Sequence, residues 1–268
     1  MKSARTKIIA ECATNHEGSL DRAKELIRAA AEAGADIVKF QSWQAKTLVD
    51  QQDAGMERYR RSELSDDAHR ELMEECRLRG VQFLTTCFDI GRVEFLGSLG
   101  LPLIKVASLD VGSVRMLEAL KQHFDELIVS TGMTNEAEMR RCVEVLADRN
   151  LTLLHCVTLY PTPAANANLA RMDWLRKFTP QVGYSDHTLG TDAAKLAIAR
   201  GAVYVEKHFT LDRSLGPSHA FCATPEEIRD MAQWARTVEE LNGQSDPALS
   251  ETEVENRKFF IGRWGDNR

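Results

Sequence analysis

The chain contains no apolar run close to the roughly 20 residues that a membrane-spanning helix needs. It also lacks an excess of positive charge, because 34 lysines and arginines stand against 40 aspartates and glutamates. A net charge of −6 does not supply the basic field that a general nucleic-acid or membrane-surface binder requires. We therefore expect no nucleic-acid partner and no membrane partner, and the attraction of any anionic ligand must be local.

Paired cysteines and an export signal are missing as well. The six cysteines form no C-x-x-C pair, and the first residues, MKSARTKIIAECATNH, hold only a very short apolar run. Reduced thiols in a cytoplasmic protein are the expectation. No G-x-G-x-x-G follows the first expected strand, which argues against a dinucleotide-binding sheet. The chain is 43% hydrophobic, enough to bury one large core.

Runs rich in β-branched residues alternate with helical patterns along almost the whole chain. The expected strands are Lys7–Cys12, Asp36–Ser42, Gln82–Phe88, Leu103–Ser108, Glu126–Gly132, Thr152–Val157, Gln181–Asp186 and Tyr204–Thr210. The expected helices are Leu20–Ala33, Ser65–Arg79, Gly91–Leu99, Val114–His123, Asn135–Asp148, Asn168–Phe178, Thr191–Arg200 and Pro225–Leu241. This α/β alternation predicts a single-domain (β/α)8 TIM barrel over residues 1–243, with a doubly wound sheet as the alternative.

Two segments do not fit the repeat. Trp43–Glu63 is a long polar connection after the second strand, on the face where barrels keep their active sites. It is either a substrate loop or a solvated excursion. The other segment is the tail, residues 244–268, which we expect to pack on the barrel or on a partner subunit.

Polar side chains gather at the expected carboxyl ends of the strands. They are Glu11, Lys39, Gln41, Thr85, Thr86, Lys105, Ser108, Ser130, Thr131, His155 and Thr158. A lysine inside a buried strand is costly unless an anion pairs with it. Two lysines within a ring of hydroxyls favour a pocket for phosphate or carboxylate. A Schiff-base nucleophile and a structural ion pair remain open readings.

Two histidines end consecutive strands that are one helical crossover apart. The strands finish in Ser185-Asp186-His187 and Glu206-Lys207-His208, so a parallel sheet brings both histidines to one edge. Two neutral imidazoles make half of a divalent-metal site. The alternative, that each histidine only hydrogen-bonds within a polar strand end, stays open at this point.

Eight segments carry a resemblance that covers nearly the whole chain. They are IIAECATNHEGS, GADIVKFQ, FLTTCFD, IKVASLD, IVSTGM, LLHCVTLYPTP, VGYSDHTLG and EKHFT. In order and spacing this set resembles the sialic acid synthase (N-acetylneuraminate synthase) family. The resemblance implies a barrel that condenses phosphoenolpyruvate with the open-chain aldehyde of an amino sugar and releases phosphate. It also implies a divalent cation, manganese first, with magnesium or cobalt as alternatives.

The resemblance assigns roles to individual residues. It implies His187 and His208 as metal ligands, and phosphoenolpyruvate binding by Lys39, Thr86, Lys105, Ser108, Ser130 and Ser185. It implies catalytic roles for Glu11, Lys105, Asp110 and Tyr160, and an acceptor side formed by Gln41, Thr158, Tyr160 and Ser218. In the implied reaction the metal polarises the aldehyde, C3 of phosphoenolpyruvate attacks it, and water adds at C2. Glu11 is the candidate for handling the proton of that water.

The chain departs from the family on the acceptor side. Residues 215–219 read LGPSH where the family has P-G-P-D-H, so Ser218 replaces a carboxylate. Asp110 stands for a glutamate, Thr158 for an asparagine or serine, and Cys87 for a proline. The phosphoenolpyruvate side is intact. We therefore expect a changed acceptor.

The end of the chain is the larger departure. The family usually continues into a small antifreeze-like domain that supplies an arginine to the N-acyl group of the sugar, whereas this sequence stops at Arg268. Arg263, Trp264 or the connection after the second strand are candidates to replace that contact. Two other functions remain: a Schiff-base pyruvate aldolase that uses Lys105 or Lys39, and a catalytically silent ligand-binding barrel. A homo-oligomer is left open.

Overall fold

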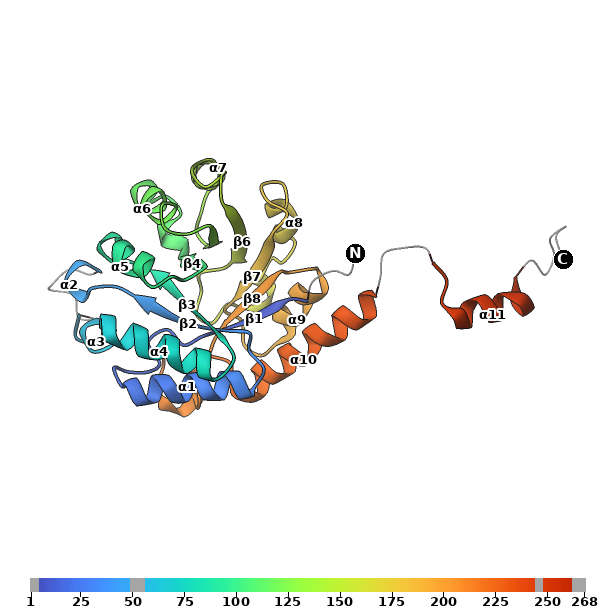
Figure 1. The fold of residues 1–268 in the computed structure, drawn as a ribbon, viewed down its shortest axis with the longest axis horizontal. Helices are drawn as coiled ribbons and strands as arrows, with labels where there is room; N and C mark the ends of the chain where they lie inside the picture. Colours follow the sequence, from blue (N-terminus) through green and yellow to red (C-terminus); the bar gives the residue numbers. More distant parts are fainter. Residues whose placement is uncertain (1–4, 49–55, 244–247, 262–268) are drawn as a thin grey trace.

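Eight parallel strands close into a barrel in the order of the sequence (Figure 1). The computed structural model describes residues 5–48, 56–243 and 248–261. The strands are β1 (Lys7–Glu11), β2 (Ile37–Ser42), β3 (Gln82–Cys87), β4 (Leu103–Val106), β5 (Glu126–Ser130), β6 (Asn150–Cys156), β7 (Val182–Asp186) and β8 (Tyr204–His208). The pairing of β1 with β8 completes the ring, so the expected TIM barrel is confirmed and the doubly wound sheet is wrong.

Helices follow the strands and form the outer layer. They are α1 (Leu20–Glu32), α4 (Asp66–Leu78), α5 (Val93–Ser98), α6 (Val114–Leu120), α7 (Glu136–Val145), α8 (Arg171–Leu175), α9 (Asp192–Ala199) and α10 (Pro225–Asn242). Polar caps begin several of them: Ser19 accepts a hydrogen bond from Arg22 N, and Asn135 forms a capping box with Glu138. Each strand lies within two residues of its expected bounds, while α8 is shorter than expected because residues 169–170 and 176–178 form turns instead.

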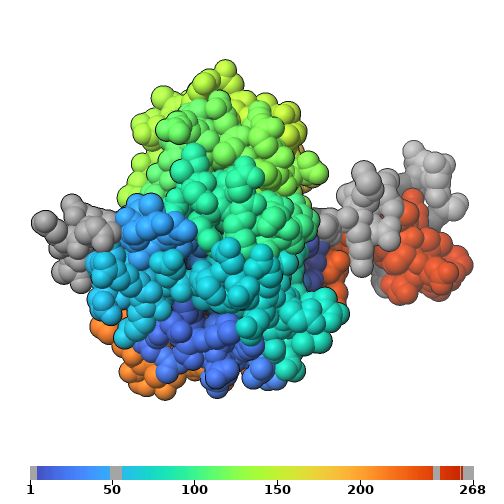
Figure 2. All heavy atoms as spheres, turned by 60° about the vertical axis from the view of Figure 1, so that its left-hand side comes forward, coloured from blue at the N-terminus to red at the C-terminus, as the bar shows by residue number. Residues whose placement is uncertain are grey.

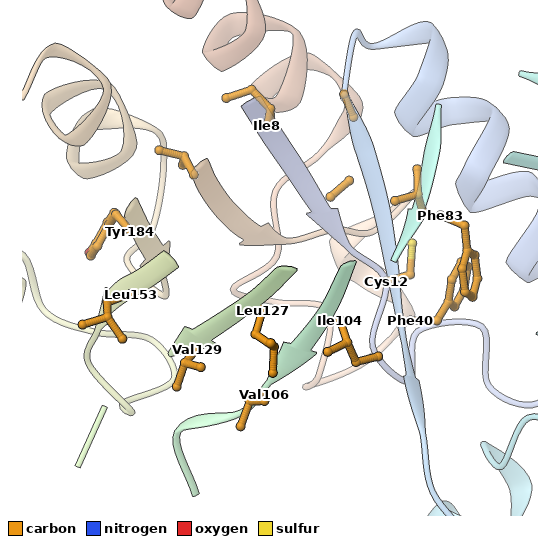
Figure 3. Packing of buried hydrophobic residues seen from close by; sticks show 14 of the residues in the cluster. Ile8, Cys12, Phe40, Phe83, Ile104, Val106, Leu127, Val129, Leu153 and Tyr184 are labelled. Carbon is orange, nitrogen blue, oxygen red and sulfur yellow. The ribbon is translucent and has the colours of Figure 1, made fainter. Parts of the chain in front are cut away.

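Strand residues alternate between two apolar layers, as the period of two in a β-strand requires. One set fills the interior of the barrel: Ile9, Ile37, Leu84, Leu103, Ile128, Leu154 and Tyr204. The other set packs outward against the helices and includes Ile8, Phe40, Leu127 and Tyr184 (Figure 3). The interior set plugs the barrel below its carboxyl-terminal mouth and separates the mouth from the amino-terminal end.

The connection after β2 is not a plain solvated loop. It holds two short helices, α2 (Ala45–Leu48) and α3 (Met56–Arg61), and residues 49–55 lie outside the described part. Trp43, Ala45 and Met56 form a small buried cluster together with Tyr59 and Phe88. These apolar positions are widely spaced in a polar sequence, which is why periodicity did not reveal them.

The end of α3 is in close contact with the loop between β1 and α1. A Cβ on Gly18 would lie 2.2 Å from the carbonyl oxygen of Arg61, and Gly18 has φ +82°. Only glycine satisfies both conditions, so the β1–α1 loop and the end of α3 meet backbone to backbone.

The tail contains one further helix, α11 (Glu251–Phe260), which begins with a capping box at Ser250. The side chains of residues 251–259 are exposed, and both Figure 1 and Figure 2 show this helix set apart from the barrel. Packing of the tail on the barrel or on a partner stays a prediction. Arg263 and Trp264 lie outside the described residues. Among the described helices, none is long and apolar enough to cross a bilayer.

Candidate active site

A polar cavity of about 110 Å³ opens at the carboxyl-terminal mouth of the barrel. Its lining comes from all eight strands and from the loops that follow several of them. The residues are Glu11, Lys39, Gln41, Thr86, Phe88, Lys105, Ala107, Ser108, Leu109, Ser130, Met133, Cys156, Thr158, Tyr160, Ser185, His187, Glu206 and His208. A cavity of this size has room for several water molecules, and therefore for a small organic anion.

Lys39 lies between two carboxylates at the floor of the cavity. Its Nζ is 3.3 Å from Oε2 of Glu11 and 3.2 Å from Oε2 of Glu206, and all three side chains are buried. Burial raises the pKa of Glu11 to about 7. Burial alone would also raise the pKa of Glu206, but Lys105 and Lys39 outweigh it and lower that pKa. The two carboxyl groups therefore differ: Glu206 is held ionised, and Glu11 exchanges its proton near neutral pH.

Lys105 faces the same cavity with weaker pairing. Its Nζ donates to Ser130 Oγ at 2.7 Å and to the carbonyl oxygen of Val106 at 3.1 Å. Burial is the main cause that lowers the pKa of Lys105 to about 8, although Glu206 acts in the opposite direction. An ammonium group without a carboxylate in contact is poorly compensated in such a setting. An anionic ligand would provide the missing compensation.

Hydroxyl groups complete the cavity. Thr86 accepts a hydrogen bond from Lys39 at 2.9 Å, and Ser185 donates to Oε1 of Glu206 at 2.9 Å. Ser108 Oγ accepts from the amide of Gly132 at 2.9 Å. A Cβ on Gly132 would lie 2.4 Å from Thr158 Oγ1 and 3.0 Å from Ser108 Oγ, so only glycine allows these hydroxyls to converge.

His187 and His208 meet at the rim of the cavity, with ring centroids 5.4 Å apart. Nδ1 of His187 lies 2.7 Å from the carbonyl oxygen of Val157, which requires a proton on Nδ1 and leaves Nε2 as an acceptor. Burial lowers the pKa of both imidazoles. Both rings are therefore held neutral, the form in which histidine binds a metal.

These histidines fit a divalent cation as two of its ligands. The backbone carbonyl behind His187 is the kind of outer partner that orients a metal-binding imidazole. No group of three or more His, Cys, Asp or Glu side chains with metal-binding geometry occurs in the described part of the chain. The remaining positions would therefore belong to water or to substrate oxygens, as in a catalytic metal site.

A second, wider hollow of about 730 Å³ lies above the cavity and shares Gln41, Phe88, Leu109, Tyr160 and His208 with it. Its walls are largely aromatic and come from separate parts of the chain. They include Trp43 and Tyr59 from the connection after β2, Phe88 after β3, Tyr160 after β6, and Phe221 and Ser218 after β8. Arg58 also lines the hollow and donates a hydrogen bond to Thr14 Oγ1 at 3.0 Å. We call this space the vestibule.

The structure brings most of the sequence-predicted residues together. Both histidines and all six residues expected to bind phosphoenolpyruvate line the cavity, as do Glu11, Gln41, Thr158 and Tyr160, and Ser218 lines the vestibule. Gln41 donates to Oε1 of Glu11 at 2.6 Å, a contact that its expected acceptor role did not include. Asp110 is not brought into the cavity. It lies beside α6, where its Oδ1 accepts from Ser113 Oγ at 2.9 Å.

The alternation of side chains along a strand explains why some polar strand residues lie outside the cavity. It also identifies one cavity residue that the sequence prediction did not include. His155 Nε2 is 2.7 Å from the carbonyl oxygen of Ala167, toward the helices, and Thr85 does not line the cavity. Glu206 lines it but had no role assigned from the sequence. The signal was available, because Glu206 is two residues before His208 and must share its face of β8.

Comparisons with known proteins agree with this geometry. A sequence model described as the NeuB family matches residues 26–247. The uncharacterized protein MJ1065 of Methanocaldococcus jannaschii is 38% identical over 271 residues, covering 98% of this chain and 80% of that protein. The N,N'-diacetyllegionaminic acid synthase of Campylobacter jejuni is 36% identical over 284 residues, covering 97% of this chain and 85% of that enzyme.

One solved structure is similar to this chain over nearly the whole length of both proteins. It is the N-acetylneuraminic acid (sialic acid) synthetase of Leptospira borgpetersenii in complex with citrate, with a TM-score of 0.89 and 28% sequence identity. The alignment covers 96% of this chain and 93% of that one. The similarity therefore includes the full barrel.

Proposed function

Because the chain belongs to the NeuB family of sugar-acid synthases, we propose that it joins phosphoenolpyruvate to the open-chain aldehyde of an N-acylated amino sugar. The products are a 3-deoxy-2-ulosonic acid and inorganic phosphate. The observation that carries the proposal is the cavity at the barrel mouth, where two lysines, a ring of hydroxyls and two neutral histidines converge.

Phosphoenolpyruvate fits the deep cavity by its charge. Lys39 and Lys105 would neutralise its phosphate and carboxylate, and the hydroxyls of Thr86, Ser108 and Ser130 would donate to the remaining oxygens. The bound anion raises the pKa of Lys105 toward its ordinary value, because it supplies the negative charge that this buried ammonium group lacks.

A divalent cation held by His187 and His208 would polarise the aldehyde oxygen of the acceptor. The bond-forming step joins C3 of phosphoenolpyruvate to the aldehyde carbon. Water then adds at C2, and the tetrahedral species expels phosphate by breaking the C–O bond. Glu11 takes up the proton from the attacking water, since its pKa of about 7 lets it exchange protons at working pH and Gln41 holds it in place. Manganese is the cation we propose, with magnesium and cobalt as the metals to compare.

The vestibule supports an acceptor with apolar substituents. Tyr59, Tyr160 and Phe221 line the vestibule with rings that are at least partly exposed, and aromatic rings pack well against the methyl of an acetamido group or of a deoxy carbon. A phosphorylated sugar would meet one exposed cation there, Arg58. We therefore propose an unphosphorylated hexose with one or two N-acetyl groups, the class of compound that a diacetyllegionaminic acid synthase name implies for the relative.

A Schiff-base aldolase is the second candidate, and one observation favours it. The pKa of Lys105 is lowered to about 8, so part of its population is the neutral amine that such an enzyme needs. The same lowering follows from burial beside Lys39 without a bound anion, however, and family membership favours the synthase. Borohydride with pyruvate separates the two, because only the aldolase gives a stable lysine adduct.

The first experiment measures phosphate release from phosphoenolpyruvate with manganese across hexoses, N-acetylhexosamines, di-N-acetylated deoxyhexoses and hexosamine 6-phosphates. We expect release with an N-acetylated, unphosphorylated acceptor. Tyr59→Ala and Phe221→Ala should raise the KM for that acceptor about tenfold or more and leave phosphoenolpyruvate binding unchanged. Phosphoenolpyruvate binding with no release across the panel would instead support the catalytically silent barrel.

We also propose the cytoplasm as the compartment. The support is that all six cysteines are free thiols and all are buried.

A further inference from the structure

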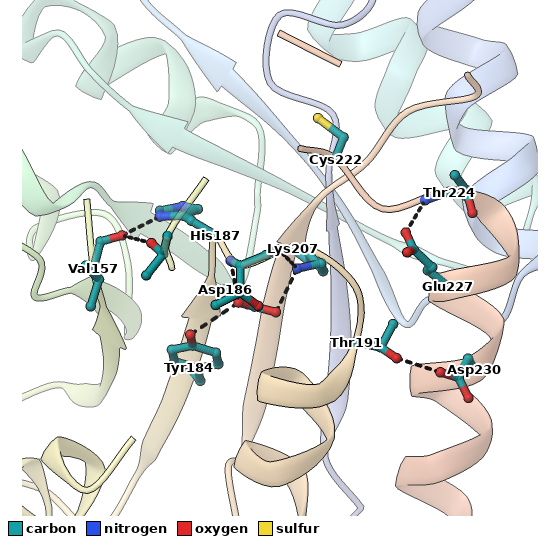
Figure 4. Close-up of polar contacts among 12 residues, drawn as sticks. Val157, Tyr184, Asp186, His187, Thr191, Lys207, Cys222, Thr224, Glu227 and Asp230 are labelled. Atoms are coloured by element: carbon teal, nitrogen blue, oxygen red, sulfur yellow. Dashed lines mark hydrogen bonds and ion pairs between the residues drawn. The ribbon is translucent and has the colours of Figure 1, made fainter. Parts of the chain in front are cut away.

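A fully buried ion pair lies directly behind the two histidines. Lys207 Nζ is 2.7 Å from Oδ2 of Asp186, and the two side chains are 1% and 0% exposed (Figure 4). Asp186 is the last residue of β7 and Lys207 the next to last of β8, and their Cα atoms are partners in the register of the sheet. Each is the residue immediately before a histidine at the mouth.

The pair faces away from the cavity. Alternation places Ser185 and His187 of one strand, and Glu206 and His208 of the next, on the inner face. Asp186 and Lys207 therefore point outward, where neither can touch phosphoenolpyruvate or the sugar. Their effect on the site must be transmitted through the backbone.

Asp186 and Lys207 both form hydrogen bonds with the backbone of Thr188, the residue that follows His187. Oδ1 of Asp186 accepts from the amide of Thr188 at 2.8 Å, and Lys207 Nζ donates to the carbonyl oxygen of Thr188 at 2.6 Å. The hydroxyl of Tyr184 donates to the same Oδ1 at 3.2 Å. These contacts link Asp186 and Thr188, the residues on either side of His187, to each other. They also link both to Lys207, the residue before His208.

Stability alone does not explain such a pair. Taking two charges out of water offsets most of their attraction, and apolar residues of similar volume are often as stabilising in such positions. A buried polar network whose members are all hydrogen-bonded fixes one arrangement of the backbone. Here the fixed backbone is that of the two strand ends that carry the imidazoles.

We propose that Asp186 and Lys207 are positioning residues that set the separation and orientation of His187 and His208 for a divalent cation. This inference rests on the proposed function, because it takes the two histidines as the ligands of that cation. The pair holds the histidines from the outer face, while the carbonyl oxygen of Val157 holds the His187 ring at Nδ1. The imidazoles are thereby arranged before any cation arrives.

The test compares cation binding in the parent protein and in the double variant Asp186→Asn/Lys207→Met, which removes both charges and nearly conserves volume. Affinity for Mn²⁺ is measured by calorimetry, and Co²⁺ serves as a probe of ligand geometry through its visible absorption. We expect the dissociation constant for Mn²⁺ to rise about 10- to 100-fold, the range seen when outer partners of metal ligands are lost. The Co²⁺ spectrum should change, while phosphoenolpyruvate affinity without metal stays the same.

Tyr204→Phe is the matched control. It removes a hydrogen bond of 3.1 Å from the Tyr204 hydroxyl to Glu126, at the other end of the same strand β8. It should lower thermal stability without changing the Mn²⁺ dissociation constant or the Co²⁺ spectrum. Asp186→Asn alone is the second variant, for use if the double variant does not fold, because the amide oxygen can still accept from Thr188 N.

The outcomes separate two kinds of failure. If the parent binds Mn²⁺ and Co²⁺ and the double variant binds both equally well with the same spectrum, the pair is purely structural and the inference is overturned. If the parent itself binds neither cation, the proposed metal-dependent function fails first, and the inference fails with it.

Discussion

The ammonium group of Lys105 lies 2.7 Å from the hydroxyl of Ser130 on the neighbouring strand, inside a cavity where no carboxylate contacts it within the described residues. Burial lowers the pKa of Lys105 to about 8, below its ordinary value of 10.5. In the free protein its charge is therefore complete only below about pH 7 and is lost as the pH rises through 8.

The affinity for phosphoenolpyruvate should fall with that charge. Between pH 7 and pH 9 we expect the dissociation constant to rise about tenfold, as a single group with a pKa near 8 requires. Binding at pH 8 should take up protons, which calorimetry in buffers of different ionisation enthalpy detects. Lys105→Arg keeps its charge throughout this range and should flatten the pH profile. A parent dissociation constant that stays flat from pH 7 to pH 9 would rule the idea out.

Removal of the metal should stop the reaction. Treatment with a chelator followed by dialysis should reduce phosphate release to below about 1% of the untreated rate, and added Mn²⁺ should restore it. His187→Ala should behave like the chelated protein, because it removes one of the two histidines that we propose as ligands of the cation. His123→Ala changes a histidine whose Nε2 faces Glu94 instead and should keep its activity. Full phosphate release after chelation would show that the reaction needs no cation and would overturn the proposed metal dependence.

Glu206 should matter for turnover more than for binding. Glu206→Gln removes a negative charge beside Lys39 and Ser185, so phosphoenolpyruvate should bind as well as before or more tightly. The same change removes one of the two carboxylates that contact Lys39, and we expect kcat to fall about 10- to 100-fold. Steady-state kinetics resolve the two effects. Glu126→Gln, at the opposite end of the barrel, is the control and should change neither constant.

Gly183 tests the packing of β7 against its neighbours. A Cβ at this position would lie 2.4 Å from the carbonyl oxygen of Tyr204 and 2.6 Å from Cδ2 of Leu154. Gly183→Ala should therefore destabilise the fold by about 1–3 kcal/mol, the usual cost of overpacking. Gly112→Ala, where nothing lies within 4 Å of the added atom, should be nearly neutral. Denaturant midpoints followed by circular dichroism compare the two variants.

Much of the barrel could be predicted because each strand and helix has its own local pattern of apolar and polar residues. A run such as IVKFQS is buried on almost its whole length, with Val38 and Phe40 toward the helices and Ile37 toward the barrel interior, as expected for a parallel strand covered on both faces. The end of each strand was harder to place, because polar residues such as Ser108 continue the pattern beyond the last residue of the strand.

The site was predictable to the extent that it follows strand alternation. Lys39, Lys105, Ser185 and His208 all lie at strand ends and face one cavity. The vestibule was not predictable in this way, because Trp43 lies in the loop after β2 and Tyr59 lies on the short helix α3, which no periodic pattern indicates. Asp110 lies at a strand end too, yet the 3-10 turn that starts at Ser108 carries it toward α6 and away from the cavity.

The apolar plug beneath the cavity has a consequence for the kinetics. Ile9, Leu84 and Ile128 seal the tube from below, so among the described residues the vestibule is the wide approach to the cavity. A sugar seated in the vestibule would lie over Lys39 and Lys105 and hinder the entry of phosphoenolpyruvate. For the proposed reaction we therefore expect phosphoenolpyruvate to bind first and the sugar second, and excess sugar to act as a dead-end inhibitor that is competitive with phosphoenolpyruvate.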